Sequence, residues 1–211
     1  SPRGAVMNPA DLPLETPHLG PLDWRVLLQW LRRDGLISDE ATRATEKRFS
    51  GADSRQHPLV RLASLGLERA RDPGRGKPLD VEALTEWLAE RVQLPYLRID
   101  PLKVDVGRVA EVMSLQYAEM RKVLPVNVAA DLVTVATSEP FDTGWLPEIE
   151  SHSRRRVKLV LANPEDVARY TTEFYSLARS VRQAQKSGET SSTASFEQLV
   201  ELGKTNKQLD A

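Results

Sequence analysis

Alternating apolar residues between positions 123 and 137 constrain the fold of this chain more than any other feature. Leu124, Val126 and Val128 alternate with other residues, and Val133 and Val135 continue the pattern after the short segment 129–131. Strict alternation is typical of a strand with one buried face, and a short connection between two such runs is typical of a β-hairpin. The sequence therefore predicts a hairpin in which Asp131 takes any left-handed position of the turn.

A third strand and a covering helix are predicted after this hairpin. Residues 154–161 contain alternating apolar positions, and Asn163-Pro164 followed by two acidic residues is a strong helix start. The helix stripe consists of Val167, Tyr170, Phe174, Leu177 and Val181. Before the hairpin, Tyr96–Ile99 reads as a short strand. Asp105 can cap one helical stretch whose apolar residues are Val109, Val112, Met113 and Tyr117.

The first part of the chain has a helical period instead. The predicted apolar faces are Leu22, Val26, Leu27, Trp30 and Leu31 in one helix, Ala41, Ala44, Thr45 and Phe49 in a second, and Val81, Leu84, Trp87 and Leu88 in a third. Gly35 ends the first helix, and Ser38 and Asp80 cap the other two. The expected fold class is α+β, with a helical subdomain at 22–93 and an αβ subdomain at 94–184 whose three- to four-stranded sheet is covered by helices.

The two ends differ in composition from this folded part. Prolines recur throughout residues 1–21, and each removes a backbone donor and disfavours helix before it, so we expect a disordered arm. Residues 185–211 begin with a run rich in Ser, Thr and Gly, which is typical of a flexible linker. Phe196, Leu199, Val200 and Leu202 then form one short amphipathic segment.

Composition and motifs exclude several classes of function. The 29 basic and 30 acidic residues leave no net field for nucleic acid, and no apolar run approaches the length of a membrane span. The chain has no cysteine and only three scattered histidines, so we expect no metal site. Gly74–Pro78 and Gly203–Thr205 resemble a phosphate-binding loop but lack its first glycine. We therefore expect no catalytic residues and no ATP hydrolysis in this chain.

Two proline turns carry a family resemblance. Ile99-Asp100-Pro101 and Ser138-Glu139-Pro140-Phe141-Asp142, placed around the small sheet, resemble the N-terminal domain of the assembly ATPases of type II secretion and type IV pilus systems over residues 22–184. The resemblance implies a module that docks and regulates. Its partner would be the cytoplasmic part of an inner-membrane platform protein, and it would couple the ATPase to secretion or pilus extension at the cytoplasmic side of the bacterial inner membrane. The ATPase core, with ATP, Mg²⁺ and the homo-hexamer contacts, is expected to follow this chain, which itself needs no cofactor.

The alternative function is cyclic di-GMP binding, because relatives of this family bind that ligand through two tandem motifs. Leu31, Gly35 and Leu36 are echoed by Leu62, Gly66 and Leu67. At the motif's arginine positions, however, the two copies contain Val26 and His57, and at the first glycine positions they contain Leu28 and Leu59. Arginine would bind a phosphate or guanine edge and glycine would allow close backbone approach, so the substitutions favour a scaffold without the ligand.

Two further groups of side chains have alternative interpretations. Arg154-Arg155-Arg156 is interpreted as a solvated strand edge in preference to a nucleic-acid or anionic-lipid site, with contact to an acidic partner as the third alternative. The four tryptophans, Trp24, Trp30, Trp87 and Trp145, are predicted to lie in cores or subdomain contacts, and stacking platforms are the alternative.

Overall fold

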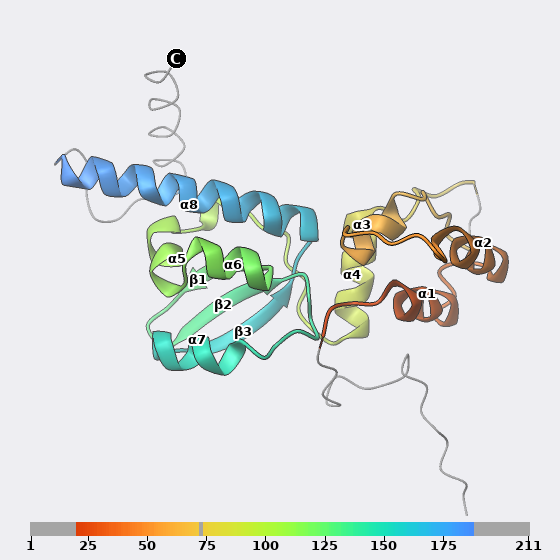
Figure 1. Cartoon of the computed structure of the whole chain (residues 1–211), viewed down its shortest axis with the longest axis horizontal. Helices are drawn as coiled ribbons and strands as arrows, with labels where there is room; N and C mark the ends of the chain where they lie inside the picture. The colour runs from red at the N-terminus through yellow and green to blue at the C-terminus, as the bar shows by residue number, and fades with distance from the viewer. Residues whose placement is uncertain (1–19, 72–73, 188–211) are drawn as a thin grey trace, which may run out of the picture. The chain divides into compact units, whose positions relative to one another are not determined.

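The computed structural model describes residues 20–71 and 74–187, which form an α+β fold of two compact units (Figure 1). Among the described residues, a helical unit extends to Gln93 and also includes Pro140–Asp142, and an αβ unit comprises Leu94–Glu139 and residues 143–187. Within the helical unit, the Phe141 ring packs edge-on against Trp30, with ring centroids 6.0 Å apart. The predicted arm at 1–21 and linker at 185–211 lie mostly outside the described residues.

The helical unit consists of four helices that begin at side-chain caps. They are α1 (Trp24–Arg33), α2 (Asp39–Phe49), α3 (Pro58–Ala63) and α4 (Val81–Arg91), and their caps are Asp23, Ser38, His57 and Asp80. Their core is built from leucines that are fully buried: Leu27, Leu28, Leu31, Leu59, Leu62, Leu84 and Leu88. The caps at Ser38 and Asp80 confirm the predicted helix starts.

The predicted apolar face of the second helix was partly wrong. Ala44 is exposed in α2, whereas Thr42 and Thr45 are buried. The threonine hydroxyls donate hydrogen bonds to the backbone oxygens of Ser38 and Ala41, at 2.9 and 2.8 Å. Because these bonds satisfy the hydroxyl groups inside the helix, the threonine methyl groups can enter the core at little cost.

The two repeated glycines both adopt left-handed backbone, with φ of 72° at Gly35 and 60° at Gly66. After α1, the amides of Gly35 and Leu36 donate to the carbonyls of Arg32 and Leu31, both at 3.0 Å, which is a Schellman termination. After α3, the amide of Gly66 instead donates to Ala63, at 3.1 Å. The echo in the sequence therefore marks two helix ends of different geometry.

The sheet of the αβ unit has the order β1-β2-β3, formed by Val123–Val128, Leu132–Thr137 and Arg156–Leu161. β1 and β2 pair antiparallel, which confirms the hairpin, and β2 pairs parallel with β3. The register of the hairpin shifts between Pro125 and Asn127, and Pro125 is tolerated because β1 is an edge strand. Asp131 does not take a left-handed position; the non-glycine residues with positive φ in the described chain are Gln93, Lys122 and Arg154.

Two predictions before the hairpin need correction. Tyr96 forms one isolated bridge with Leu161, so Tyr96–Ile99 is not a strand and the described sheet has three strands. The stretch predicted as one helix after Asp105 is divided into α5 (Val106–Val112) and α6 (Leu115–Arg121), which follow the 3₁₀ turn η2 (Pro101–Lys103). The division lies at Met113, which is extended with φ of −152°, and Ser114 caps the second helix.

Helix α8 (Pro164–Lys186) begins at the predicted Asn163 cap and contacts α5, α6, β1 and β2. Its buried side chains include Val167, Phe174 and Val181 of the predicted stripe. The helix continues through Lys186, so the predicted start of a linker at residue 185 was wrong. Helix α7 (Leu146–Ser153) contacts β3 (Figure 1).

The arginine run and the tryptophans have structural roles. Arg154 ends α7 in left-handed backbone, and the Arg155 side chain donates from Nε to the carbonyl of Ala129 at 2.7 Å, which ties β3 to the hairpin end. Trp30 and Trp145 are buried, and Trp24 and Trp87 are half-buried. No helix in the described part of the chain is long and apolar enough to span a bilayer.

Candidate functional site

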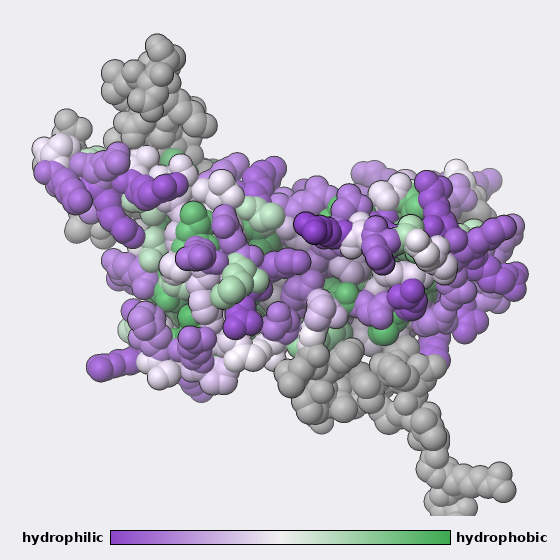
Figure 2. Space-filling view, in the orientation of Figure 1, coloured by the Kyte–Doolittle hydropathy of each residue, from purple (hydrophilic) through white to green (hydrophobic). Residues whose placement is uncertain are grey.

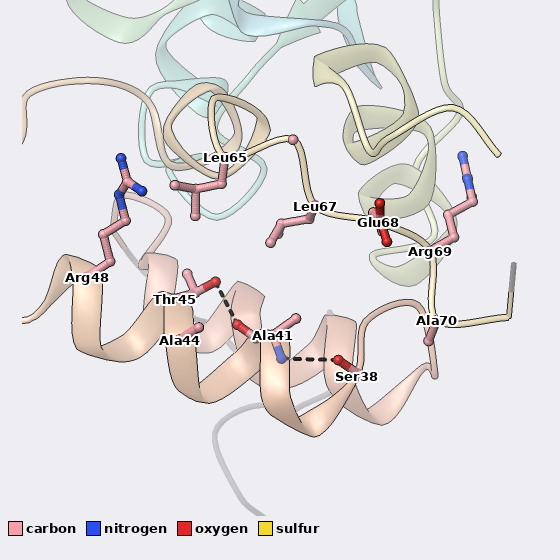
Figure 3. A pocket seen from close by; sticks show the side chains of 11 residues that line it. Ser38, Ala41, Ala44, Thr45, Arg48, Leu65, Leu67, Glu68, Arg69 and Ala70 are labelled. Atoms are coloured by element: carbon pink, nitrogen blue, oxygen red, sulfur yellow. Dashed lines mark hydrogen bonds between the residues drawn. The ribbon is translucent and has the colours of Figure 1, made fainter. Parts of the chain in front are cut away.

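A pocket in the helical unit includes two of the sequence-predicted site residues. It lies between α2 and the segment Leu65–Ala70, and its volume is about 440 Å³ (Figure 3). We call it the α2 groove. Gly66 and Leu67 line it, which places the second copy of the repeat at its wall.

The middle of the α2 groove is apolar. Leu65 and Leu67 project from the segment toward α2, and the small side chains of Ala41 and Ala44 form the opposite wall (Figure 3). The nearby hydroxyls do not change this character. Ser38 accepts from the Ala41 amide at 3.0 Å, and Thr45 donates to the Ala41 carbonyl.

Each end of the α2 groove carries an arginine. Arg48 lies at one end and Arg69 at the other, with the Glu68 side chain near Arg69 (Figure 3). Within residues 20–71 and 74–187, neither arginine forms an ion pair or a side-chain hydrogen bond. A guanidinium without an internal partner is available for a carboxylate or phosphate of a ligand. The groove therefore suits a ligand with an apolar middle and acidic ends.

The remaining motif residues are part of the scaffold. Leu31 and Leu62 are fully buried, as are Leu28 and Leu59 at the positions of the motif's first glycines. His57 occupies the second arginine position and serves as the cap of α3, where its Nδ1 accepts from the Leu59 amide at 3.1 Å. These side chains are committed to the core or to a helix start, which leaves no guanidinium at either motif position.

Leu36 lines a separate pocket of about 670 Å³ beside α4, together with Asp34, Trp87 and Arg91. The Asp34 carboxylate accepts from Trp87 Nε1 at 2.8 Å and forms an ion pair with Arg91. The Arg91 guanidinium also lies over the Trp30 ring, 4.9 Å from its centroid. Because this carboxylate already has two donors, the cluster joins the end of α1 to α4 and has little capacity for a ligand.

Arg48 and Arg69 were missed by the sequence analysis. They are far apart in the chain, and neither belongs to a recognisable motif. Only the packing of the segment Leu65–Ala70 beside α2 brings them to one groove. The sole available signal was Gly66, whose left-handed turn directs that segment along α2.

Comparison with known proteins finds a family similarity in the αβ unit. Residues 92–181 match the MshEN domain family. This match covers 90 of the 211 residues of the chain. The chain is also 33% identical over 162 residues to the type IV pilus assembly ATPase TfpB of Acinetobacter baylyi. That alignment covers 76% of this chain and 27% of the relative, so the chain spans about a quarter of the length of the curated relative it matches.

Two solved structures have a related arrangement at low identity. A structure of MshE with cdg has a TM-score of 0.49 and 18% identity, and covers 71% of this chain and 98% of that chain. The N-terminal domain of XpsE has a TM-score of 0.45 and 14% identity, with coverages of 76% and 95%. At these values neither structure supports a residue-by-residue correspondence with this chain.

Proposed function

We propose that this chain is the docking and regulatory module of an ATPase that assembles type IV pili or drives type II secretion. The observation that supports this most strongly is the 33% identity to a type IV pilus assembly ATPase over 162 residues, most of this chain, combined with the MshEN match at 92–181. The partner is the cytoplasmic part of an inner-membrane platform protein, and the module places the ATPase at the cytoplasmic side of that membrane.

The α2 groove is the proposed contact for this partner. The face seen in Figure 2 is mainly hydrophilic, and its apolar areas are small and separate, so a broad hydrophobic interface is absent from that view. A narrow apolar groove between two arginines can instead take a short amphipathic segment of the partner. Apolar contact would supply most of the affinity. The charges at the ends would orient the bound segment and increase its association rate.

ATP, Mg²⁺ and hexamer formation belong in this proposal to the ATPase core and not to this chain. The two parts need different structures. Nucleotide chemistry needs a phosphate-binding loop, whereas docking needs only a shaped surface. Binding of the platform protein to the module would then be coupled to nucleotide turnover in the core through the chain that joins them.

The first experiment measures binding of the whole chain to the purified cytoplasmic region of the platform protein encoded with the same machine. We expect a 1:1 complex in biolayer interferometry. A shortened chain, residues 94–187, tests which unit docks, and it should lose binding while circular dichroism shows that it remains folded. Absence of any complex with the whole chain would contradict the proposed function. Full affinity in the shortened chain would move the docking surface to the αβ unit.

A further inference from the structure

A second cleft, in the αβ unit, is separate from the α2 groove. It opens between the α5–α6 junction and α8, and its volume is about 450 Å³. Its apolar lining comprises Ala110, Met113, Leu115, Tyr175 and Ala178. Alanine on both α5 and α8 leaves space between the helices. The Tyr175 hydroxyl already donates to the Met113 carbonyl at 2.7 Å, so that proton is not available to a ligand.

The rim of this cleft is mainly cationic. Arg179 and Arg182 are exposed, lie on the same side of α8 and line the cleft, with His152 and the opposite charge of Glu111 nearby. Within the described residues, neither arginine forms an ion pair or a side-chain hydrogen bond. The cleft therefore suits a segment that carries apolar side chains and two carboxylates close together.

The chain itself contains such a segment beyond the described residues. Residues 196–202 read Phe-Glu-Gln-Leu-Val-Glu-Leu, so apolar residues at 196, 199 and 200 have the spacing of one helical face, and Glu197 and Glu201 lie four residues apart. In a helix, side chains three or four residues apart lie on the same face with Cβ atoms about 5–6 Å apart. In a helical conformation, these two glutamates would therefore have a spacing similar to that of Arg179 and Arg182 in α8. The segment is acidic, and the rim is basic.

The connection is long enough for this contact. The stretch 187–195 has nine residues. A flexible chain of that length has an end-to-end distance of about 17 Å. Along α8, Arg182 is only about 6 Å from the helix end at Lys186. We propose that residues 196–202 bind in this cleft of the same chain, with Glu197 and Glu201 against Arg179 and Arg182. The bound segment would shorten the tether between the αβ unit and the chain that follows residue 202, and its release would lengthen that tether.

The absence of cysteine from the chain allows a direct test by cross-linking. The first variant pairs Glu111→Cys, at the cleft rim, with Gln198→Cys. The matched control pairs Gln198→Cys with Ser176→Cys, which is exposed on α8 but does not line the cleft. With a short bismaleimide, the cleft pair should form an intramolecular cross-link at least about tenfold faster than the control, because binding raises the effective concentration of the two thiols. Equal rates would overturn the proposal, and cross-linked dimers alone would assign the cleft to a second copy.

Charge reversal tests the pairing itself. Arg179→Glu with Arg182→Glu should reduce the cross-linking rate of the cleft pair to that of the control. Adding Glu197→Arg and Glu201→Arg should restore the fast rate. Circular dichroism of each variant checks that α8 is intact. Two outcomes would contradict the proposed contact between glutamates and arginines. One is a cross-linking rate that stays fast after the arginines are reversed, and the other is a rate that stays slow after the glutamates are reversed as well.

Discussion

The hydroxyl of Tyr175 in α8 donates a 2.7 Å hydrogen bond to the backbone carbonyl of Met113, where α5 ends. Both residues are buried. The bond satisfies a carbonyl that α5 leaves without a helical partner, and it joins the longest helix of the αβ unit to the break between α5 and α6.

Removal of this hydroxyl should destabilise the αβ unit. Tyr175→Phe leaves the Met113 carbonyl buried without its donor, which costs about 1–3 kcal/mol. The matched control is Tyr170→Phe, because Tyr170 is only half-buried and its hydroxyl accepts from Arg169 at the surface. The control should cost less than about 0.5 kcal/mol. Urea unfolding followed by circular dichroism measures both, and equal losses would contradict the assigned role of the buried bond.

Tyr175 should also make the free energy of unfolding depend on pH in the alkaline range. Burial raises the pKa of Tyr175 above its ordinary value of 10.0. Above that pH the unfolded chain loses the phenolic proton while the folded chain keeps it, so the free energy of unfolding falls as pH rises. The slope attributable to this group approaches about 1.4 kcal/mol per pH unit. Wild type should therefore lose stability faster than Tyr175→Phe between pH 10 and pH 11, and parallel slopes would refute this.

The Asp34 cluster should stabilise the helical unit. Asp34 receives hydrogen bonds from Trp87 and Arg91. Asp39 has one ion-pair partner among the described residues, Arg32 at 3.5 Å, and 71% of its side chain is exposed. Asp34→Ala should cost about 1–3 kcal/mol, and Asp39→Ala less than about 1 kcal/mol. Hydrogen exchange of amides in α1 and α4 measures the difference. Unchanged protection in Asp34→Ala would show that the cluster adds nothing to stability.

Elements that depend on a few neighbouring residues could be predicted from the sequence, whereas features that depend on contacts between distant residues could not. The hairpin and the start of α8 were predicted because alternation and the Asn163-Pro164 start act over a few residues. The break at Met113 was missed because a continuous helical period passes through it, and its stabilising partner, Tyr175, lies 62 residues away. Phe141 was placed in a turn, but its contact with Trp30 depends on packing between distant segments.

The α2 groove also depends on contacts between distant segments, so its residues could be predicted only in part. Gly66 and Leu67 were identified from the repeat, but the repeat was assigned to a degenerate ligand motif and not to a groove wall. Arg48 and Arg69 have no local signal, because a solvated arginine and a ligand-binding arginine have the same sequence pattern. Only the path of the segment Leu65–Ala70 distinguishes them.

Cyclic di-GMP should bind this chain weakly or not at all. His57 caps α3 and Leu28 and Leu59 are buried, so the motif's arginines and close-approach glycines have no equivalents. We expect a dissociation constant above about 100 μM, which is roughly 5 to 6 kcal/mol of binding free energy. Isothermal titration calorimetry with the dinucleotide measures this. A low-micromolar constant would contradict the scaffold interpretation of the repeat.

The most direct test of the account measures the affinity of α2 groove variants for the cytoplasmic region of the platform protein. The double variant Arg48→Glu with Arg69→Glu reverses the charge of the arginine at each end of the groove. The control is the single variant Arg43→Glu, because Arg43 is exposed on α2 but does not line the groove. Calorimetry should show a loss of at least about tenfold, or 1.4 kcal/mol, for the double variant and almost none for the control. Equal affinity of wild type and the double variant would contradict docking through this groove.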